Sequence, residues 1–394
     1  MSTVKVNTVD KRTGSTLTLG GCGTTVTLPA TPSAGDIISI KDYARTAATN
    51  NINFCRNGSK MDGFCASGSI TTDGESTTLI YVDGTQGWTS ILDNTTNQYG
   101  AAYITATGGT ISCSPCGDYK IHTFTSDGCF SISAVGNPAG SDSVDYIVVA
   151  GVGGSASDRG GGGGAGGYRE GYNPGSYTAS PLATSALPVS VQTYPIIVGG
   201  GGSTGSGADG NSGSNSVFST ITSTGGGGGG RSPGTFAAGL PGGSGGGSGS
   251  VAPHPNGAIG GTGNTPPVSP PQGNGGGTAG NTPSGYTTGG GGGAGAVGGN
   301  GTTPTGGSAG DGVNTSISGS SVGYSGGGAG ASDLPGSQGT PAGPFGGGTA
   351  ATEDAGTPGT AGTANTGGGG GGSAGSTNGG AGGSGIVIIR YKFQ

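Results

Sequence analysis

The chain has 394 residues, of which 102 are glycine and 8% are charged, and its formal net charge at pH 7 is −6. Without a basic stripe to neutralise phosphates, this composition argues against a nucleic-acid partner. Apolar residues make up 29% of the chain and form a conventional core only where they concentrate. No window approaches the ~18 consecutive apolar residues of a membrane span, and the N-terminal MSTVKVNTVDK is not typical of a secretory signal.

Residues 1–30 and 31–98 are predicted to form two small antiparallel β modules. Alternation in TLTL and TTVTLP predicts strands in residues 1–30, which we interpret as an extended β leader that needs a partner chain or a neighbouring sheet. Residues 31–98 predict a small β-sandwich with hairpin turns at Asn57-Gly58 and Asp83-Gly84. So small a sandwich gains stability from trimerisation.

Residues 99–152 are predicted to hold a β-hairpin and the first strands of a larger domain. The alternating DYKIHTF, the turn residues Ser126-Asp127-Gly128 and the returning FSISAV are typical of a hairpin. The apolar run VDYIVVAGV that follows predicts a buried strand.

Residues 153–394 are predicted to form a glycine-rich domain with a strand at 188–198 and a closing strand at 386–393. A flexible linker is the usual interpretation of such composition, but disordered tails carry charge, and residues 171–385 hold a single cationic residue, Arg231. We therefore expect bundled polyglycine-II-type helices that bond to one another. No segment has helical periodicity, so the expected fold class is all-β with essentially no α-helix.

The terminal IVIIRYKFQ is the strongest strand sequence in the chain. We expect it to pair with DYIVVAG (145–151) or TYPIIVGG (193–200), which would enclose the glycines between strands.

Six cysteines are present, and free thiols at strand positions are the simplest expectation. A zinc site from Cys113, Cys116, His122 and Cys129 and a Cys55–Cys65 disulfide are the alternatives. We expect no metal and no cofactor. Repeated GxGxxG matches are inevitable in a glycine tract, and no helix follows them to bind a pyrophosphate.

Four β motifs around the glycine runs carry a family resemblance: YKIHTFTSDGCFSIS, VDYIVVAGVGG, VQTYPIIVGGGGS and GGSGIVIIRY. They resemble the glycine-rich domain of bacteriophage tail-fibre and adhesin proteins. GSTLTLGGCGTTVTLP, CRNGSK and LIYVDGTQGW are similar to N-terminal modules of marine podovirus and myovirus tail fibres. Cys22 and Cys129 depart from the serine or threonine expected there.

The resemblance implies a virion protein, made and assembled in the host cytoplasm. It implies a homotrimer whose N-terminal part attaches to other tail proteins (tail tube, adaptor or nozzle). Its distal domain then binds a bacterial surface receptor, a glycan or an outer-membrane protein. The resemblance implies no contact with nucleic acid and no membrane insertion.

Enzymatic activity is not expected. Paired carboxylates for glycan cleavage would be Asp158 with Glu170, or Glu353 with Asp354, but no cleft-forming architecture accompanies them. His122 lies in a predicted strand and His254 in a loop, so neither is a credible catalytic base.

Candidate receptor-binding residues are side chains that interrupt the glycine tract: Phe236, His254, Tyr286, Tyr324 and Phe345. In turn-rich loops, such rings stack on sugars or apolar receptor loops while glycine and serine adapt their hydrogen bonds. The alternative is that they wedge the bundle. Two other functions stay open: a structural virion spacer without receptor binding, and an ice- or surface-binding protein, against which the irregular threonine spacing argues.

Overall fold

The computed structural model describes residues 25–42, 45–90, 102–115, 117–136, 140–232, 237–250, 258–280, 285–334, 337–353 and 356–394. The one helix in these ranges is the short 3-10 helix η1 (Gly343–Phe345), so the predicted all-β class is confirmed. None of the described segments is a helix long and apolar enough to cross a membrane. Most of the leader predicted at 1–30 lies outside the described residues.

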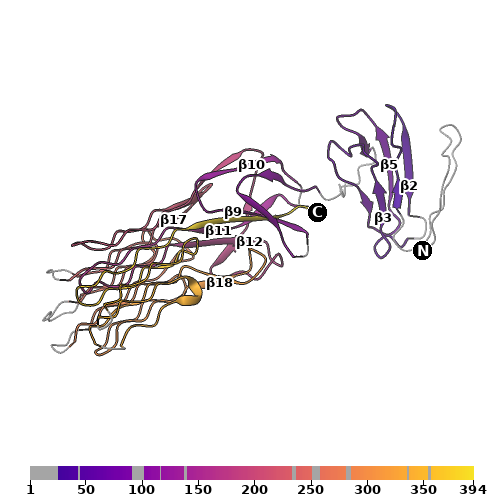
Figure 1. Ribbon diagram of the computed structural model, residues 1–394. Coiled ribbons are helices and arrows are strands. Elements are labelled where there is room, and N and C mark those ends of the chain that lie inside the picture. Colours follow the sequence, from indigo (N-terminus) through magenta and orange to yellow (C-terminus); the bar gives the residue numbers. More distant parts are fainter. Residues whose placement is uncertain are drawn as a thin grey trace. The chain divides into compact units, whose positions relative to one another are not determined.

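The chain divides into two compact units (Figure 1). The N-terminal unit contains residues 1–105, 134–142 and 392–394, and the glycine-rich unit contains residues 106–133 and 143–391. The four module boundaries expected from the sequence stay predictions.

The N-terminal unit contains two three-stranded sheets, ordered β1-β3-β4 and β2-β5-β6. Trp88, fully buried, and Tyr81 pack edge to face in its core at 5.5 Å. The predicted hairpin at Asp83-Gly84 is confirmed, because β5 pairs antiparallel with β6 and Asp83 Oδ1 accepts the N–H groups of the next turn residues. The strands are β1 (Thr25–Thr27), β2 (Ile37–Lys41), β3 (Ile52–Cys55), β4 (Ser69–Ile70), β5 (Ser76–Tyr81) and β6 (Trp88–Ser90).

One pairing in this unit differs from the predicted antiparallel module: β1 runs parallel to β3. The chain between them forms β2 in the other sheet, and such a crossover returns the chain in the same direction.

The glycine-rich unit is built on two larger sheets. A seven-stranded sheet has the order β13-β12-β11-β20-β9-β8, with β14 also paired to β11. Its strands are β8 (Thr110–Cys113), β9 (Tyr119–Phe124), β11 (Ser143–Val149), β12 (Tyr168–Tyr172), β13 (Ala183–Ser185), β14 (Leu187–Pro188) and β20 (Ile386–Lys392).

A five-stranded sheet has the order β17-β16-β15-β10-β7, and β18 and β19 form a separate hairpin. Its strands are β7 (Thr105–Thr107), β10 (Gly128–Ala134), β15 (Thr193–Ile197), β16 (Ser216–Phe218) and β17 (Ile221–Ser223), and the hairpin consists of β18 (Val313–Thr315) and β19 (Val322–Tyr324).

The hairpin predicted around Ser126-Asp127-Gly128 is wrong. The turn exists, but β9 belongs to the seven-stranded sheet and β10 to the five-stranded sheet. The two strands face each other across the core, where the rings of His122 and Phe130, both fully buried, meet edge to face at 5.1 Å. Burial of these two side chains between the sheets replaces the expected edge-to-edge pairing.

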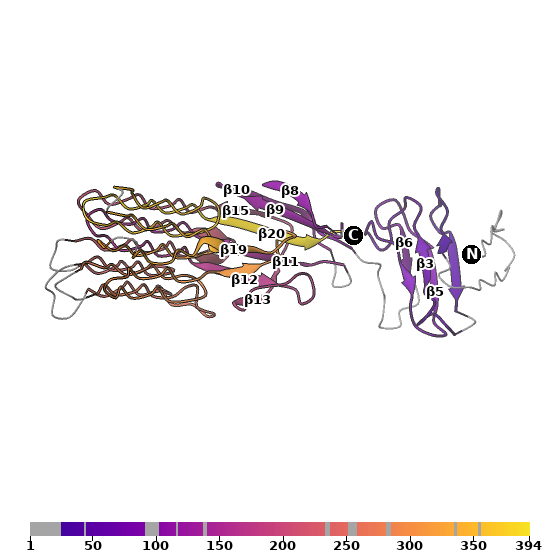
Figure 2. The ribbon, with the colours of Figure 1, turned by 60° about the horizontal axis from the view of Figure 1, so that its bottom comes forward.

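The closing strand β20 lies in the middle of the seven-stranded sheet, between β11 and β9 (Figures 1 and 2). It pairs antiparallel with β11, which confirms the expected pairing with DYIVVAG. Ile386 and Ile388 enter the main apolar core on one face, while Tyr391 stacks on His122 at 5.5 Å on the other. Val149 and Ile386 are register partners, so the end of β11 and the start of β20 lie side by side although 236 residues of sequence lie between them.

Extended glycine segments run side by side from the sheets and form a bundle (Figure 2). In residues 161–167, successive amides donate to three different neighbouring segments in turn, at 2.8–3.3 Å, and the cycle repeats every three residues. The donor–acceptor pairs are Gly161–Gly230, Gly164–Gly227 and Gly167–Thr224 for the first neighbour, Gly162–Gly289 and Ala165–Gly292 for the second, and Gly163–Gly370 and Gly166–Gly367 for the third.

A β-strand has a period of two and directs its hydrogen bonds within one sheet. A period of three is what a polyglycine-II helix has. The helix type itself stays a prediction. Hydrogen bonds to three neighbouring segments nevertheless explain how the buried backbone N–H and C=O groups of the bundle find partners without charged side chains.

Glycine is required where these segments touch. A Cβ at Gly163 would lie closer than 3.0 Å to the carbonyl oxygen of Gly153, a backbone atom that has no room to move. The same holds for Gly291, whose Cβ would collide with Gly163 itself. Backbone therefore packs directly on backbone, and side chains buried within the bundle are small, such as those of Ala165, Ala329 and Ser244.

We expect Gly163→Ala to destabilise the glycine-rich unit by about 1–3 kcal/mol or more, because an added methyl group overpacks a site lined by backbone. Gly200→Ala is the matched control, since Gly200 is exposed and its Cβ would meet nothing within 4 Å. Urea unfolding of both variants measures the difference. Equal stability of the two variants would contradict the close packing of backbone.

Candidate functional site at the end of the bundle

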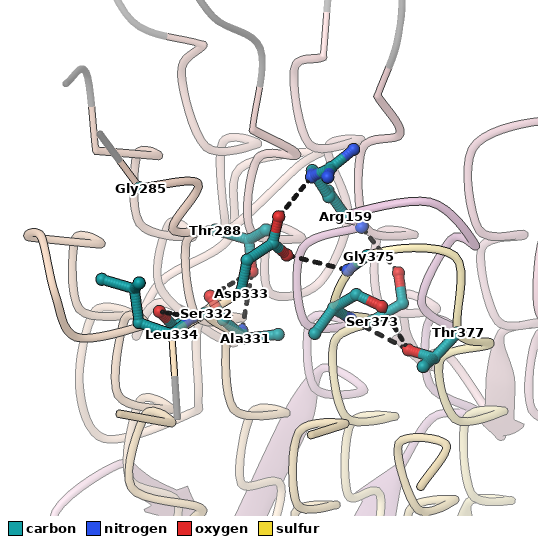
Figure 3. A network of polar contacts seen from close by, with 12 residues as sticks. Arg159, Gly285, Thr288, Ala331, Ser332, Asp333, Leu334, Ser373, Gly375 and Thr377 are labelled. Carbon is teal, nitrogen blue, oxygen red and sulfur yellow. Dashed lines mark hydrogen bonds and ion pairs between the residues drawn. The ribbon is translucent and has the colours of Figure 1, made fainter. Parts of the chain in front are cut away.

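Turns from several distant segments meet at one end of the bundle, away from the strands that lie at the bottom of the view in Figure 3. Backbone hydrogen bonds join them: Ser232 N–H donates to Asp158 O at 3.2 Å, Ser250 N–H to Arg159 O at 3.1 Å, and Arg159 N–H to Gly375 O at 3.2 Å. Asp333 N–H donates to Tyr286 O at 3.1 Å. We define the distal network as Asp158, Arg159, Arg231, Tyr286, Asp333, Glu353 and Gly375.

Arg159 is the centre of the distal network (Figure 3). Its Nε donates to Asp333 Oδ2 at 2.6 Å, and Asp333 Oδ1 accepts the Gly375 N–H at 2.8 Å. The guanidinium carbon lies 4.2 Å from the centre of the Tyr286 ring, a cation–π contact. The Arg159 side chain is 33% exposed and that of Asp333 is 12% exposed, so the pair sits at the boundary with solvent.

Two consecutive residues of this network adopt left-handed backbone conformations: Asp158 has φ 55° and Arg159 has φ 54°. Glycine takes such values without strain, and L-residues pay roughly 1–2 kcal/mol each. In a chain so rich in glycine, non-glycine residues here indicate that their side chains are needed. Asp158 uses its carboxylate to accept a hydrogen bond from Arg231 Nη2 at 2.8 Å.

Glu353 lies against the backbone of Gly375. A Cβ at Gly375, which has φ 48°, would overlap the Glu353 carboxylate. Asp209 also reaches this end, where its Oδ1 accepts the Arg231 N–H at 2.8 Å. The described charged side chains at this end are therefore two arginines and four carboxylates, and the Arg159 side chain is 33% exposed against 27% for Arg231.

The structure separates the predicted receptor-binding residues. Tyr286 lies in the distal network, half-buried under Arg159. Tyr324 is 3% exposed and belongs to the main core, where burial raises its pKa to about 12. Phe236 and His254 lie outside the described residues.

Tyr324 was expected in a turn-rich loop, but it lies in a strand. It belongs to β19 and is the register partner of Val313 in β18. Phe345 lies in η1, half-buried, where its side chain covers Gly323 of the same hairpin. The β18–β19 hairpin explains both positions by packing, and we leave Tyr324 and Phe345 out of the contact surface proposed below.

Sequence reasoning missed Arg159 and Asp333, although one signal pointed to them. The tract is nearly free of charge, so each charged residue in it is conspicuous. The spacing of 174 residues between Arg159 and Asp333 gives no hint that they pair, and only the fold brings them together.

Of the two carboxylate pairs considered for catalysis, Asp158 and Glu170 do not lie together. Glu170 is buried in β12 and accepts hydrogen bonds from Tyr168, Tyr177 and the Ser180 N–H at 2.9 Å each, and from Thr315 at 2.7 Å. All four donors are groups of the surrounding fold, so both carboxylate oxygens of Glu170 are occupied by hydrogen bonds within the protein. The eight residues of the extended segment 160–167 lie between Asp158 and β12 and span about 24 Å at ~3 Å per residue, beyond the ~5–9 Å of glycosidase pairs. Asp354 lies outside the described residues.

The cysteine alternatives are also resolved in part. Cys55, Cys65, Cys113 and Cys129 are free and exposed, so the Cys55–Cys65 disulfide is absent. His122 is fully buried, with Nδ1 2.7 Å from Gly108 O and Nε2 3.1 Å from the Tyr391 hydroxyl. Both ring nitrogens are used, which removes the histidine from the zinc alternative, and the described residues contain no cluster of metal ligands. Cys22 and Cys116 are outside the described residues.

The described fold is an all-β domain in which paired strands enclose a bundle of glycine-rich segments. A family model described as a glycine-rich domain matches residues 125–392, and the chain belongs to this family. The match ends with β20, in agreement with the structural role of that strand. No curated protein matches the chain.

A buried acid next to the closing strand makes stability depend on pH. Asp145, 1% exposed, accepts hydrogen bonds from Asn173 at 2.7 and 3.1 Å and is the register partner of Arg390. Burial raises the pKa of Asp145 to about 6. The folded state therefore binds this proton more tightly than the unfolded state between about pH 4 and 6, and the contribution of Asp145 to stability becomes less favourable as pH rises through that window.

We expect Asp145→Asn to lose this dependence. Urea unfolding at pH 4, 5, 6 and 7 should show that wild type, measured relative to the variant, gains up to about 3 kcal/mol as pH falls from 7 to 4. A wild-type-to-variant difference that stays constant over this range would contradict a raised pKa of Asp145.

Proposed function

We propose that the protein is a non-enzymatic bacteriophage tail fibre whose glycine-rich domain binds a receptor on the host cell surface. The observation that carries the proposal is the distal network. Turns from separate segments converge at one end of the bundle and present Arg159, Tyr286 and Glu353 there, all at least partly accessible. The likeness of the β motifs to phage tail-fibre sequences supports the same assignment.

The construction of the bundle suits recognition. Each interior segment is tied to three neighbours by backbone hydrogen bonds, so its conformation depends little on the sequence of the turns at its end. Binding residues on loops that a regular scaffold positions are a general solution, because the loops vary without loss of the core.

We further propose that the protein acts in the virion tail as a homotrimer and that its N-terminal part binds other tail proteins such as the tail tube, adaptor or nozzle. The small core of the N-terminal unit supports association, because two short three-stranded sheets bury little apolar surface alone. The proposal includes no contact with nucleic acid and no membrane insertion.

The proposal is tested with fluorescently labelled full chain and cells of the bacterium whose phage carries the gene. We expect the chain to bind the cells and to block adsorption of the phage. Tyr286→Ala should weaken both effects about 10-fold or more, since one stacked ring is worth about 1–3 kcal/mol. The matched control is Tyr172→Ala in β12, which changes a tyrosine outside the distal network.

Absence of both cell binding and adsorption blocking would refute receptor recognition and leave the structural spacer as the function. Equal loss of binding in the two variants would point to a general loss of folding, which thermal unfolding of each variant separates from a local effect.

A further inference from the structure

The distal network contains a fork of hydrogen-bond donors that no described residue of the chain accepts from. The Nε edge of Arg159 is held by Asp333 at 2.6 Å, and one face of the guanidinium is held by the Tyr286 ring at 4.2 Å. Among the described residues, the two terminal nitrogens of Arg159 have no hydrogen-bond partner, and the side chain is 33% exposed. The fork is therefore both oriented and accessible.

Acceptors surround the same point. Gly375 connects them: its N–H donates to Asp333 at 2.8 Å, its carbonyl accepts the Arg159 N–H at 3.2 Å, and the exposed Glu353 carboxylate lies over its Cα. A side chain at position 375 would displace that carboxylate. Donor nitrogens and acceptor oxygens are thus held around one glycine, in contact with solvent.

The charges around Gly375 favour an uncharged ligand. Around Gly375, one guanidinium faces two carboxylates, Asp333 and Glu353, so a carboxylated or sulfated ligand meets repulsion as well as attraction. A cationic ligand is repelled by the positive charge of the Arg159 guanidinium. A hydroxyl group both donates and accepts hydrogen bonds, so neighbouring sugar hydroxyls satisfy the fork and a carboxylate together without a charge of their own.

We propose that Arg159, Glu353 and Gly375 form a subsite for the hydroxyl groups of a neutral glycan. This inference rests on the receptor recognition proposed above and narrows it to a substrate class. Asp333 and Tyr286 act as positioning residues, because they hold the guanidinium while its terminal nitrogens bind.

Biolayer interferometry with the immobilised full chain tests the subsite. The neutral probes are dextran, mannan and the neutral fraction of surface polysaccharide extracted from the host cells, and the acidic probes are alginate and chondroitin sulfate. We expect binding of a neutral probe. Arg159→Lys, which keeps the charge but loses the planar fork, and Glu353→Gln should each weaken it about 10- to 100-fold, the value of a charge-assisted hydrogen bond. Arg169→Lys in β12 is the matched control and should bind as wild type does.

Three results would overturn the subsite: failure of every neutral probe to bind, preferential binding of the acidic probes, or loss of binding in EDTA, which would indicate a bridging cation. Equal affinity of Arg159→Lys and Arg169→Lys would also overturn it. Cell binding by the labelled chain is measured separately, so persistent cell binding with any of these results leaves receptor recognition standing and removes the neutral-glycan subsite alone.

Discussion

The glycine-rich domain depends on one interaction: backbone amides that donate, residue by residue, to three different neighbouring segments. A β-strand is hydrogen-bonded only to the strands on either side of it within one sheet. Over residues 161–167, by contrast, the segment is hydrogen-bonded to neighbours on three sides. This bonding leaves no space for Cβ atoms at positions such as Gly163. It explains why the interior is glycine and why charged groups collect where the segments end.

The bundle has almost no apolar core, so its ends must be held elsewhere. Val149 at the end of β11 and Ile386 at the start of β20 are register partners in the seven-stranded sheet, and the glycine-rich tract runs between them. Ile147, Val149, Ile386 and Ile388 supply part of the main apolar cluster. The apolar sheet thus offsets the chain entropy lost on ordering the glycines, which is high for this residue. The apolar sheets therefore stabilise the unit at one end, and the polar side chains of the distal network lie at the other.

The sequence predicted the strands of this domain well and their partners less well. IVIIRYKFQ and DYIVVAGV are long β-branched runs, and both are predicted as strands from the sequence. Two partners are open for IVIIRYKFQ at that level, DYIVVAG and TYPIIVGG, and the structure pairs it with DYIVVAG. The partition of β9 and β10 between two sheets was missed, because alternation identifies a strand but carries no information on which sheet receives it. His122 and Phe130 meet edge to face between the two sheets, and their sequence positions are equally compatible with a hairpin.

The candidate site was accessible to sequence reasoning only in part. Tyr286 was named from its place in the glycine tract, but by the same criterion so was Tyr324, which is buried in a short hairpin that the sequence does not reveal. Arg159 and Asp333 were not named, because their significance comes from a contact across 174 residues and from the left-handed backbone at Arg159. Both are tertiary properties.

Hydrogen–deuterium exchange of the full chain, followed by mass spectrometry, tests the central claim most directly. Glycine amides that donate to three neighbouring segments should exchange slowly, and peptides covering residues 160–167 should be protected to an extent comparable with peptides covering β11. Exchange of residues 160–167 at the rate of an unstructured peptide, with β11 still protected, would contradict the account, because it would mean that the glycine tract is a flexible insertion between paired strands.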